Sequence, residues 1–148
     1  MSNCVIIMRG LPGSGKTTTA ESLVPGLTPF DVADKKWGAV SVSADHYFTD
    51  FASGTYNWQG SLLPCAHGHC KSSFQELLSR KCPTIVVDNT NTTPGEYEEY
   101  VSLAERAGYK VNVVDLFDAG LSDEELASRN THGVSVAGIS RMRSRYVR

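Results

Sequence analysis

The chain has 148 residues, of which 41% are hydrophobic, and its formal net charge is −2. These values suit one ordinary core, so we expect residues 1–148 to form a single domain. A slightly acidic protein has no global positive field, so any affinity for nucleic acid must come from a local basic patch. The apolar run at the amino end is too short to cross a bilayer and has no basic region before it. We therefore expect a cytoplasmic protein without membrane contact, whose four cysteines are reduced.

The first predicted elements border a glycine-rich turn. Residues 4–8 form a continuous apolar run that predicts a buried strand, and residues 17–24 are predicted to form the helix after the turn. A second short strand is predicted at 40–43. Apolar residues at helical spacing then predict a helix over 62–78, with Pro64 in its first turn.

The second half of the chain continues the alternation of strands and helices. Residues 84–87 are strongly β-prone, and residues 94–107 follow a threonine cap with proline first and glutamate third, which predicts a helix. Residues 111–116 predict a fourth strand. A short helix is predicted after the cap at 122–125, and a last helix over 135–147.

Strands that alternate with helices predict an α/β fold with a parallel sheet. Parallel neighbours need long crossover connections, so we expect about four parallel strands with helices on both faces, in three layers. Ligands of such sheets bind beyond the carboxyl ends of the strands. The polar residues 10–17, Asp45 and 88–91 all follow predicted strands, so we expect them to meet at one edge.

A phosphate-binding loop is the most specific motif of the chain. Residues 10–17, GLPGSGKT, match G-x-x-x-x-G-K-[ST] between a predicted strand and a predicted helix. Backbone amides of such a loop bind phosphate oxygens, Lys16 reaches the terminal phosphates, and Thr17 gives its hydroxyl to Mg²⁺. We expect ATP or another nucleoside triphosphate to bind at Gly10, Gly13, Ser14, Gly15, Lys16, Thr17 and Thr18.

Asp45 follows the second predicted strand and has two interpretations. A carboxylate there could accept the proton of an incoming hydroxyl and orient it for in-line attack on the γ-phosphate. The alternative is that Asp45 only caps a helix that begins at His46. The spacing alone favours neither.

Asp88 ends the third predicted strand and precedes the polar residues Asn89, Thr90 and Asn91. This position suits a carboxylate that holds Mg²⁺ through water or contacts the acceptor. A turn rich in Asp and Asn is the alternative. We favour the site, because the apolar strand directs Asp88 toward the loop.

After Glu125 the chain has six basic residues and no acidic ones: Arg129, His132, Arg141, Arg143, Arg145 and Arg148. Phosphoryl transfer builds negative charge that an arginine of a mobile lid can neutralise, and residues 129–133 suit a C-terminal lid with Arg129 in that role. For most of the later arginines, a solvated helix face is the better interpretation.

Residues 65–70, CAHGHC, contain four potential zinc ligands. On a helix, Cys65 and His69 share a face while His67 points elsewhere, so one ion cannot collect all of them. We therefore disfavour a zinc site, and we favour the interpretation in which His67 lines an acceptor groove.

Four segments taken together carry a resemblance to a known family: residues 10–17, Ser43–Phe48, Val87–Asn91 and Arg129–Val134. In this order they resemble the small AAA_33-type P-loop kinases related to phage polynucleotide 5'-kinase, over nearly the whole chain. The resemblance implies a P-loop kinase-like fold with a C-terminal lid. It also implies transfer of the γ-phosphate to the 5'-hydroxyl of a nucleic acid, a single-stranded DNA or RNA end.

The resemblance assigns roles to individual residues. It implies that Asp45 is the general base, that Asp88 helps to place the acceptor, and that Lys16 and Arg129 act on the transferred phosphate. One position departs from the phage kinase, which has an arginine three residues after its base where this chain has Phe48. Tyr47 or Phe48 could instead stack on a base. We expect the acceptor to contact Asp45, Phe48, Asp88, Asn89 and Thr90.

Two other functions share this donor site. A kinase of a small metabolite or nucleoside would differ only in the acceptor groove. A nucleotide-binding module without catalysis would use Asp45 only as a cap.

Overall fold

The computed structural model describes residues 3–33 and 38–148. Its main sheet contains five parallel strands in the order β2-β3-β6-β1-β7. Their bounds are β1 Cys4–Arg9, β2 Thr28–Pro29, β3 Ala39–Val42, β6 Thr84–Asp88 and β7 Lys110–Asp115. The α/β fold with a parallel sheet is thereby confirmed.

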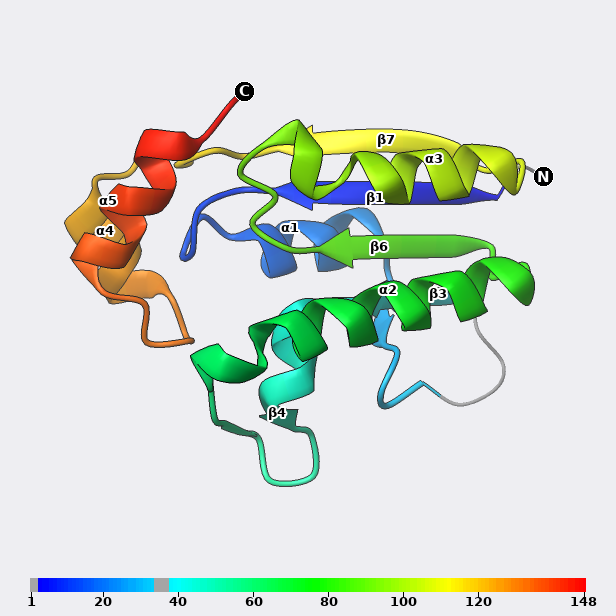
Figure 1. The fold of residues 1–148 in the computed structure, drawn as a ribbon, viewed down its shortest axis with the longest axis horizontal. Helices are drawn as coiled ribbons and strands as arrows, with labels where there is room; N and C mark the ends of the chain where they lie inside the picture. The colour runs from blue at the N-terminus through cyan, green and yellow to red at the C-terminus, as the bar shows by residue number, and fades with distance from the viewer. Residues whose placement is uncertain (1–2, 34–37) are drawn as a thin grey trace.

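Helices cover both faces of the sheet, as predicted. The helices are α1 Lys16–Leu23, α2 Leu63–Ser79, α3 Glu98–Arg106, α4 Asp123–Arg129 and α5 Val136–Arg145. Figure 1 shows α2 and α3 in front of the sheet and α1 behind it, while α4 and α5 lie beyond the carboxyl ends of the strands.

The core has a larger and a smaller part on the two faces of the sheet. On one face, alternate strand residues such as Val5 and Ile85 pack against Phe74 of α2 and Tyr100 of α3. On the other face, Met8 and Val86 pack against α1. The alternation follows from the two-residue period of strands, which sends neighbouring side chains to opposite faces. Burial on both faces explains the continuous apolar runs of β1 and β6.

The strand count differs from the expected four because of β2 at the edge. This strand has two residues, Thr28 and Pro29, and pairs with β3. Proline is tolerated only at such edges, and two residues leave no periodic pattern for sequence reasoning to detect.

The helix predicted over 94–107 is interrupted. A 3₁₀ turn, η3 Pro94–Glu96, comes first, Tyr97 has φ −127°, and α3 begins at Glu98. The capping interaction itself forms, because the Glu96 carboxylate accepts the Thr93 backbone N–H at 3.1 Å. The Tyr97 ring faces the Arg9 guanidinium at 5.0 Å, a tertiary contact that no local pattern contains.

Between β3 and α2 the chain forms a 3₁₀ turn and a small hairpin. The turn is η1 Ala44–Phe48, and strands β4 Thr49–Asp50 and β5 Thr55–Tyr56 pair antiparallel. A second short turn, η2 Gly60–Leu62, leads into α2. No helix in the described part of the chain is long and apolar enough to cross a membrane.

Candidate active site

The phosphate-binding loop joins β1, which lies between β6 and β7 in the sheet, to α1. Gly15 caps α1 with φ 93°, and Gly13 has φ 83°, values that glycine adopts without a steric penalty. A Cβ at Gly13 would lie 2.3 Å from the carbonyl oxygen of Leu126. Helix α4 therefore packs directly on the backbone of the loop.

Lys16 is the first residue of α1 and is partly buried. Its Nζ lies 3.4 Å from the carbonyl oxygen of Leu11. Burial lowers the pKa of the Lys16 ammonium, while the charges of Asp88 and Asp45 oppose that shift. The ammonium therefore lies in the field of both carboxylates that the sequence singled out.

Thr17 and Asp88 are brought together from α1 and the end of β6. The Thr17 hydroxyl donates to Asp88 Oδ2 at 2.7 Å. Hydroxyl and carboxylate oxygens are ligands that suit Mg²⁺, and the pair lies beside the loop that would hold the phosphates. These two residues therefore fit the ion. Thr18, the next residue of α1, is exposed.

Asp45 lies in η1, directly after β3, and its carboxylate has two partners. The Tyr56 hydroxyl donates to Oδ1 at 2.7 Å, and Nδ1 of His132 lies 3.1 Å from Oδ2. The Asp45 backbone N–H donates to the Ser43 hydroxyl at 3.2 Å, so Ser43, and not Asp45, caps the turn.

Burial disfavours the charged form of Asp45, but its neighbours outweigh burial. The hydrogen bond and charge of His132, the Tyr56 hydroxyl and the Lys16 charge together lower the Asp45 pKa. The group is therefore ionised at neutral pH. Its side chain remains 44% exposed, so an incoming hydroxyl can reach it.

Asn89 and Thr90 connect the ends of neighbouring strands. The Asn89 side chain accepts the Ala44 backbone N–H at 2.9 Å, and its amide nitrogen lies 3.6 Å from Cys70 Sγ. The Thr90 carbonyl accepts the Gly10 N–H at 3.1 Å. These contacts fix η1 and the phosphate loop to the end of β6. That Asn89 and Thr90 also contact the acceptor stays a prediction.

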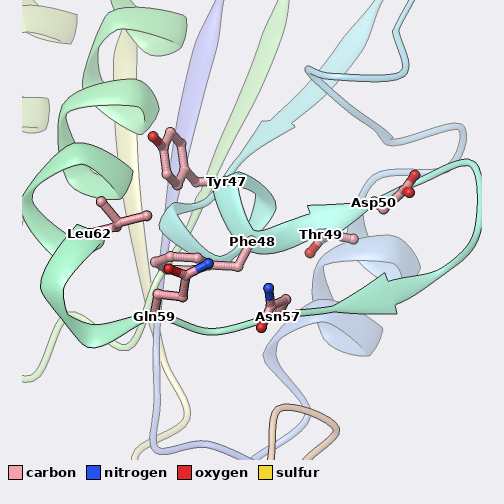
Figure 2. Close-up of a pocket in the computed structure, with 7 residues that line it drawn as sticks. All are labelled: Tyr47, Phe48, Thr49, Asp50, Asn57, Gln59 and Leu62. Atoms are coloured by element: carbon pink, nitrogen blue, oxygen red, sulfur yellow. The ribbon is translucent and has the colours of Figure 1, made fainter.

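The two aromatic residues considered for base stacking have different environments. Phe48 is 7% exposed and packs against Ala44 and Ala66, whereas Tyr47 is 42% exposed. Both border an open hollow of about 240 Å³ between η1, the hairpin and η2 (Figure 2). Its other lining residues are Thr49, Asp50, Asn57, Gln59 and Leu62. Of the two rings, that of Tyr47 is the one that a ligand can cover.

The residue of the predicted lid that contacts Asp45 is His132. Arg129 ends α4 and is exposed, and within residues 3–33 and 38–148 no hydrogen bond or ion pair joins it to Asp45. The sequence placed His132 in the lid segment but gave no sign of this contact. Reasoning from the sequence did not identify Tyr56, because no local sequence pattern indicates that a tyrosine in a hairpin contacts Asp45.

The CAHGHC segment lies in α2 and distributes its side chains around the helix. Cys65 and His67 are exposed, while Cys70 is buried. In the described residues, no group of three or more His, Cys, Asp or Glu side chains is placed to hold a metal ion. The role of His67 in an acceptor groove stays a prediction.

The loop, the parallel sheet and the clustered carboxylates define a P-loop kinase-like α/β domain. The family model AAA_33, described as "AAA domain", matches residues 5–148, so the chain belongs to this family. This membership supports a nucleotide-dependent phosphotransferase in general.

One curated relative and one solved structure illustrate the similarity. Human NEDD4-binding protein 2 is 34% identical over 149 residues, which cover 97% of this chain but only 8% of that protein. A chain in the structure titled "Structure of Pnkp1/Rnl/Hen1 complex" has a TM-score of 0.56 at 21% identity, covering 86% of this chain and 39% of that chain. The structural likeness at this identity concerns the fold.

Proposed function

We propose that this domain transfers the γ-phosphoryl group of a nucleoside triphosphate to the 5'-hydroxyl at a nucleic-acid end. The observation that carries the proposal is an exposed, ionised Asp45 in the field of Lys16, beside the Thr17–Asp88 pair. The choice of a nucleic-acid acceptor rests on the order of the four segments that resemble the polynucleotide kinase family.

In this reaction Asp45 takes the proton of the acceptor hydroxyl as its oxygen attacks the γ-phosphorus. The new O–P bond forms while the bond from the γ-phosphorus to the β–γ bridging oxygen breaks, and the nucleoside diphosphate leaves. Lys16 and the loop amides stabilise the charge on the phosphates. Mg²⁺ bound at Thr17 and Asp88 would add further positive charge there. Arg129 would neutralise charge on the same phosphates from the lid.

The hollow of Figure 2 favours a second candidate, a nucleoside or small-metabolite kinase. Among the described residues that line it there is no lysine or arginine, and Asp50 places a carboxylate on it. Phe48, where the phage kinase has an arginine, is buried and uncharged. These features suit a neutral acceptor better than a phosphate backbone.

One assay separates these functions. Labelled γ-phosphate from ATP or GTP is offered to a 5'-hydroxyl oligonucleotide, to the same oligonucleotide with a 5'-phosphate, and to a panel of nucleosides. We expect transfer only to the 5'-hydroxyl oligonucleotide, with kcat lowered about 10²-fold or more in Asp45→Asn at unchanged nucleotide affinity.

The other outcomes each point to one alternative. Transfer to nucleosides but not to oligonucleotides would establish the second candidate. Nucleotide binding without transfer to any acceptor would overturn the kinase proposal and leave a binding module.

A further inference from the structure

Three segments that are far apart in the sequence meet at the Asp45 carboxylate. Asp45 comes from η1, Tyr56 from β5 and His132 from the loop between α4 and α5. The Tyr56 and His132 rings also stack on each other, with centroids 4.3 Å apart and planes inclined by 20°. Each of the three side chains therefore contacts the other two.

The loop that carries His132 is shaped by its own hydrogen bonds. Asn130 Oδ1 accepts the backbone N–H groups of His132 at 3.2 Å and Val134 at 2.9 Å. Its amide nitrogen donates to the carbonyl oxygens of Ala127 at 2.9 Å and Val134 at 3.0 Å. Because Asn130 closes the loop, His132 is presented to Asp45 without relying on the contact itself.

The protonation states at this contact follow from the charges around it. Asp45 is ionised and can only accept, so Nδ1 of His132 carries the hydrogen that joins them. Burial, together with the hydrogen bond to Asp45, raises the pKa of Tyr56, so its hydroxyl stays a donor. The other titratable groups acting on the cluster are Lys16 from α1 and His46 from η1.

The two hydrogen bonds orient the carboxylate without blocking it. An ionised carboxylate has about four lone-pair sites, and His132 and Tyr56 each use one. The remaining sites and the exposed part of the side chain are open to an incoming hydroxyl. The carboxylate is thus fixed in rotation and still free to act as a base.

We infer that His132, with Tyr56, is a positioning residue of the transfer reaction, and that the lid acts by orienting the base Asp45 when it is docked. This inference rests on the proposed function and adds a role for the lid that does not depend on Arg129. To orient Asp45 in this way, the lid needs only a neutral N–H donor at the position of His132 Nδ1. The proton of the acceptor stays on Asp45.

The test compares two substitutions of His132 in the full chain. Asparagine can place an amide N–H near the position of Nδ1, whereas alanine removes the donor. We expect His132→Ala to lower kcat about 10-fold to 100-fold, with little change in nucleotide affinity or acceptor KM. We expect His132→Asn to recover most of that loss, and Tyr56→Phe, which keeps the stack, to lose less than His132→Ala.

The matched control is a second His–Asp pair. His69 Nε2 lies 3.0 Å from Asp31 Oδ1, and the His69 ring packs beside Tyr47 and not on Asp45, so His69→Asn should leave kcat at saturating acceptor unchanged. A double-mutant cycle of His132→Ala with Asp45→Ala, read by thermal unfolding, measures the coupling between the two side chains without any assay of transfer, and a coupling of zero would overturn the inference.

The outcomes distinguish this inference from the proposed function. Wild-type kcat in His132→Ala overturns the inference while transfer itself stands. Equal losses in His132→Ala and His132→Asn also overturn it, because they indicate that the ring carries a proton rather than orients the base. Absence of transfer in the wild-type protein overturns the proposed function, and the inference with it.

Discussion

At the scale of single residues, the proposed acceptor side of the site borders two adjacent aromatic side chains. Phe48 fills a small core with Ala44 and Ala66, while the neighbouring Tyr47 lines the hollow and is 42% exposed. Aromatic faces bind bases of single strands by stacking, and this does not require a charged partner. Tyr47 is therefore the residue to test for acceptor binding.

We expect Tyr47→Ala to raise the acceptor KM by roughly tenfold, because stacking on one base contributes about 1–3 kcal/mol. The value of kcat at saturating acceptor should change little, since Tyr47 does not contact Asp45. Steady-state kinetics with a 5'-hydroxyl oligonucleotide measure both values.

The control for Tyr47 is Trp58→Ala. Trp58 is 56% exposed and does not line the hollow, so its removal should leave the acceptor KM near the wild-type value. Phe48→Ala is unsuitable, because it would open a cavity in the core and cost about 3–5 kcal/mol of stability. An unchanged KM in Tyr47→Ala would exclude stacking on this ring.

The sequence predicted where those candidate residues lie whose positions follow from local patterns. Residues 10–17 follow β1, Asp45 follows β3 and Asp88 ends β6, and parallel strands bring such residues to one edge. Tyr56 and His132 contact Asp45 through tertiary packing of a hairpin and a loop, which have no period in the sequence. The buried environment of Phe48 depends on α2 in the same way.

At the scale of elements, α4 and α5 form a unit that rests on the phosphate loop. Leu126 of α4 and Ile139 of α5 are fully buried and pack with Leu11 of the loop. Arg143 of α5 donates hydrogen bonds to Asp118, in the segment after β7, at 2.5 Å and to Asp123, the first residue of α4, at 2.8 Å. The orientation of α5, and through α4 that of the lid loop, therefore depends on Arg143.

We expect Arg143→Gln to lower the free energy of unfolding by about 1 kcal/mol at pH 7, since partly exposed ion pairs contribute little each. The hydrogen bond from Arg143 lowers the pKa of Asp118. A depressed carboxyl pKa stabilises the fold above the unfolded value, near 3.8, and this stabilisation is lost as pH falls through the folded value. The difference in the free energy of unfolding between variant and wild type should thus shrink as the pH falls below the unfolded value of Asp118.

Denaturant unfolding of both proteins at a series of pH values measures this difference. Arg141→Gln, an exposed arginine of the same helix, serves as the control and should match the wild type at every pH. If the free energy of unfolding of Arg143→Gln differs from that of the wild type by the same amount down to pH 2, the contact with Asp118 is not the source of the stabilisation.

The predicted elements match the structure wherever the pattern is long. The strands at β1, β3, β6 and β7 and all five helices lie close to their expected places. The elements that differ from the prediction are short or depend on tertiary contacts. They are the two-residue β2, the β4–β5 hairpin, and the turn at η3, where Tyr97 packs on Arg9. Short elements are stabilised by contacts outside their own sequence, so local propensity cannot detect them.

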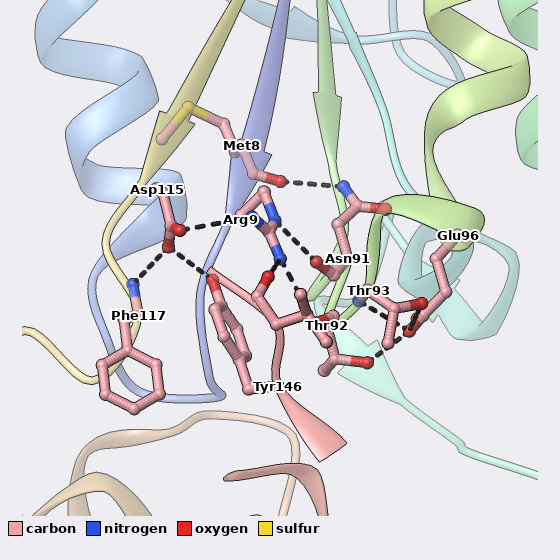
Figure 3. A network of polar contacts seen from close by, with 10 residues as sticks. Met8, Arg9, Asn91, Thr92, Thr93, Glu96, Asp115, Phe117 and Tyr146 are labelled. Atoms are coloured by element: carbon pink, nitrogen blue, oxygen red, sulfur yellow. Dashed lines mark hydrogen bonds and ion pairs between the residues drawn. The ribbon is translucent and has the colours of Figure 1, made fainter.

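At the scale of the whole molecule, Arg9 joins strand β1 to three distant segments (Figure 3). Its guanidinium donates to the carbonyl oxygens of Asn91, Thr92 and Val147 and pairs with Asp115 at 3.2 Å. The rings of Tyr97 and Tyr146 lie over it at 5.0 and 4.9 Å. Arg9 directly precedes the phosphate loop, so this network fixes the loop against β6, β7 and the end of the chain.

We expect Arg9→Met to lower the free energy of unfolding by about 3–5 kcal/mol, because the carbonyl of Asn91 loses its guanidinium donor and Asp115 loses its ion-pair partner. Arg9→Lys should recover only part of the loss, since an ammonium cannot reach all of these acceptors in a planar fork. The free energy of unfolding, measured with denaturant, and the nucleotide affinity should fall together, because the loop loses the contacts that hold its first residue in place.

Arg145→Met is the matched control for this network. Arg145 donates to the Thr92 hydroxyl at 3.2 Å from an exposed position, so its removal should cost no more than about 1 kcal/mol. If Arg9→Met and Arg145→Met were equally stable, buried hydrogen bonding at Arg9 would not be what holds the molecule together. A loss of both stability and nucleotide affinity in Arg9→Met alone would show that the phosphate loop depends on the residue that joins β1 to Asn91, Asp115 and Val147.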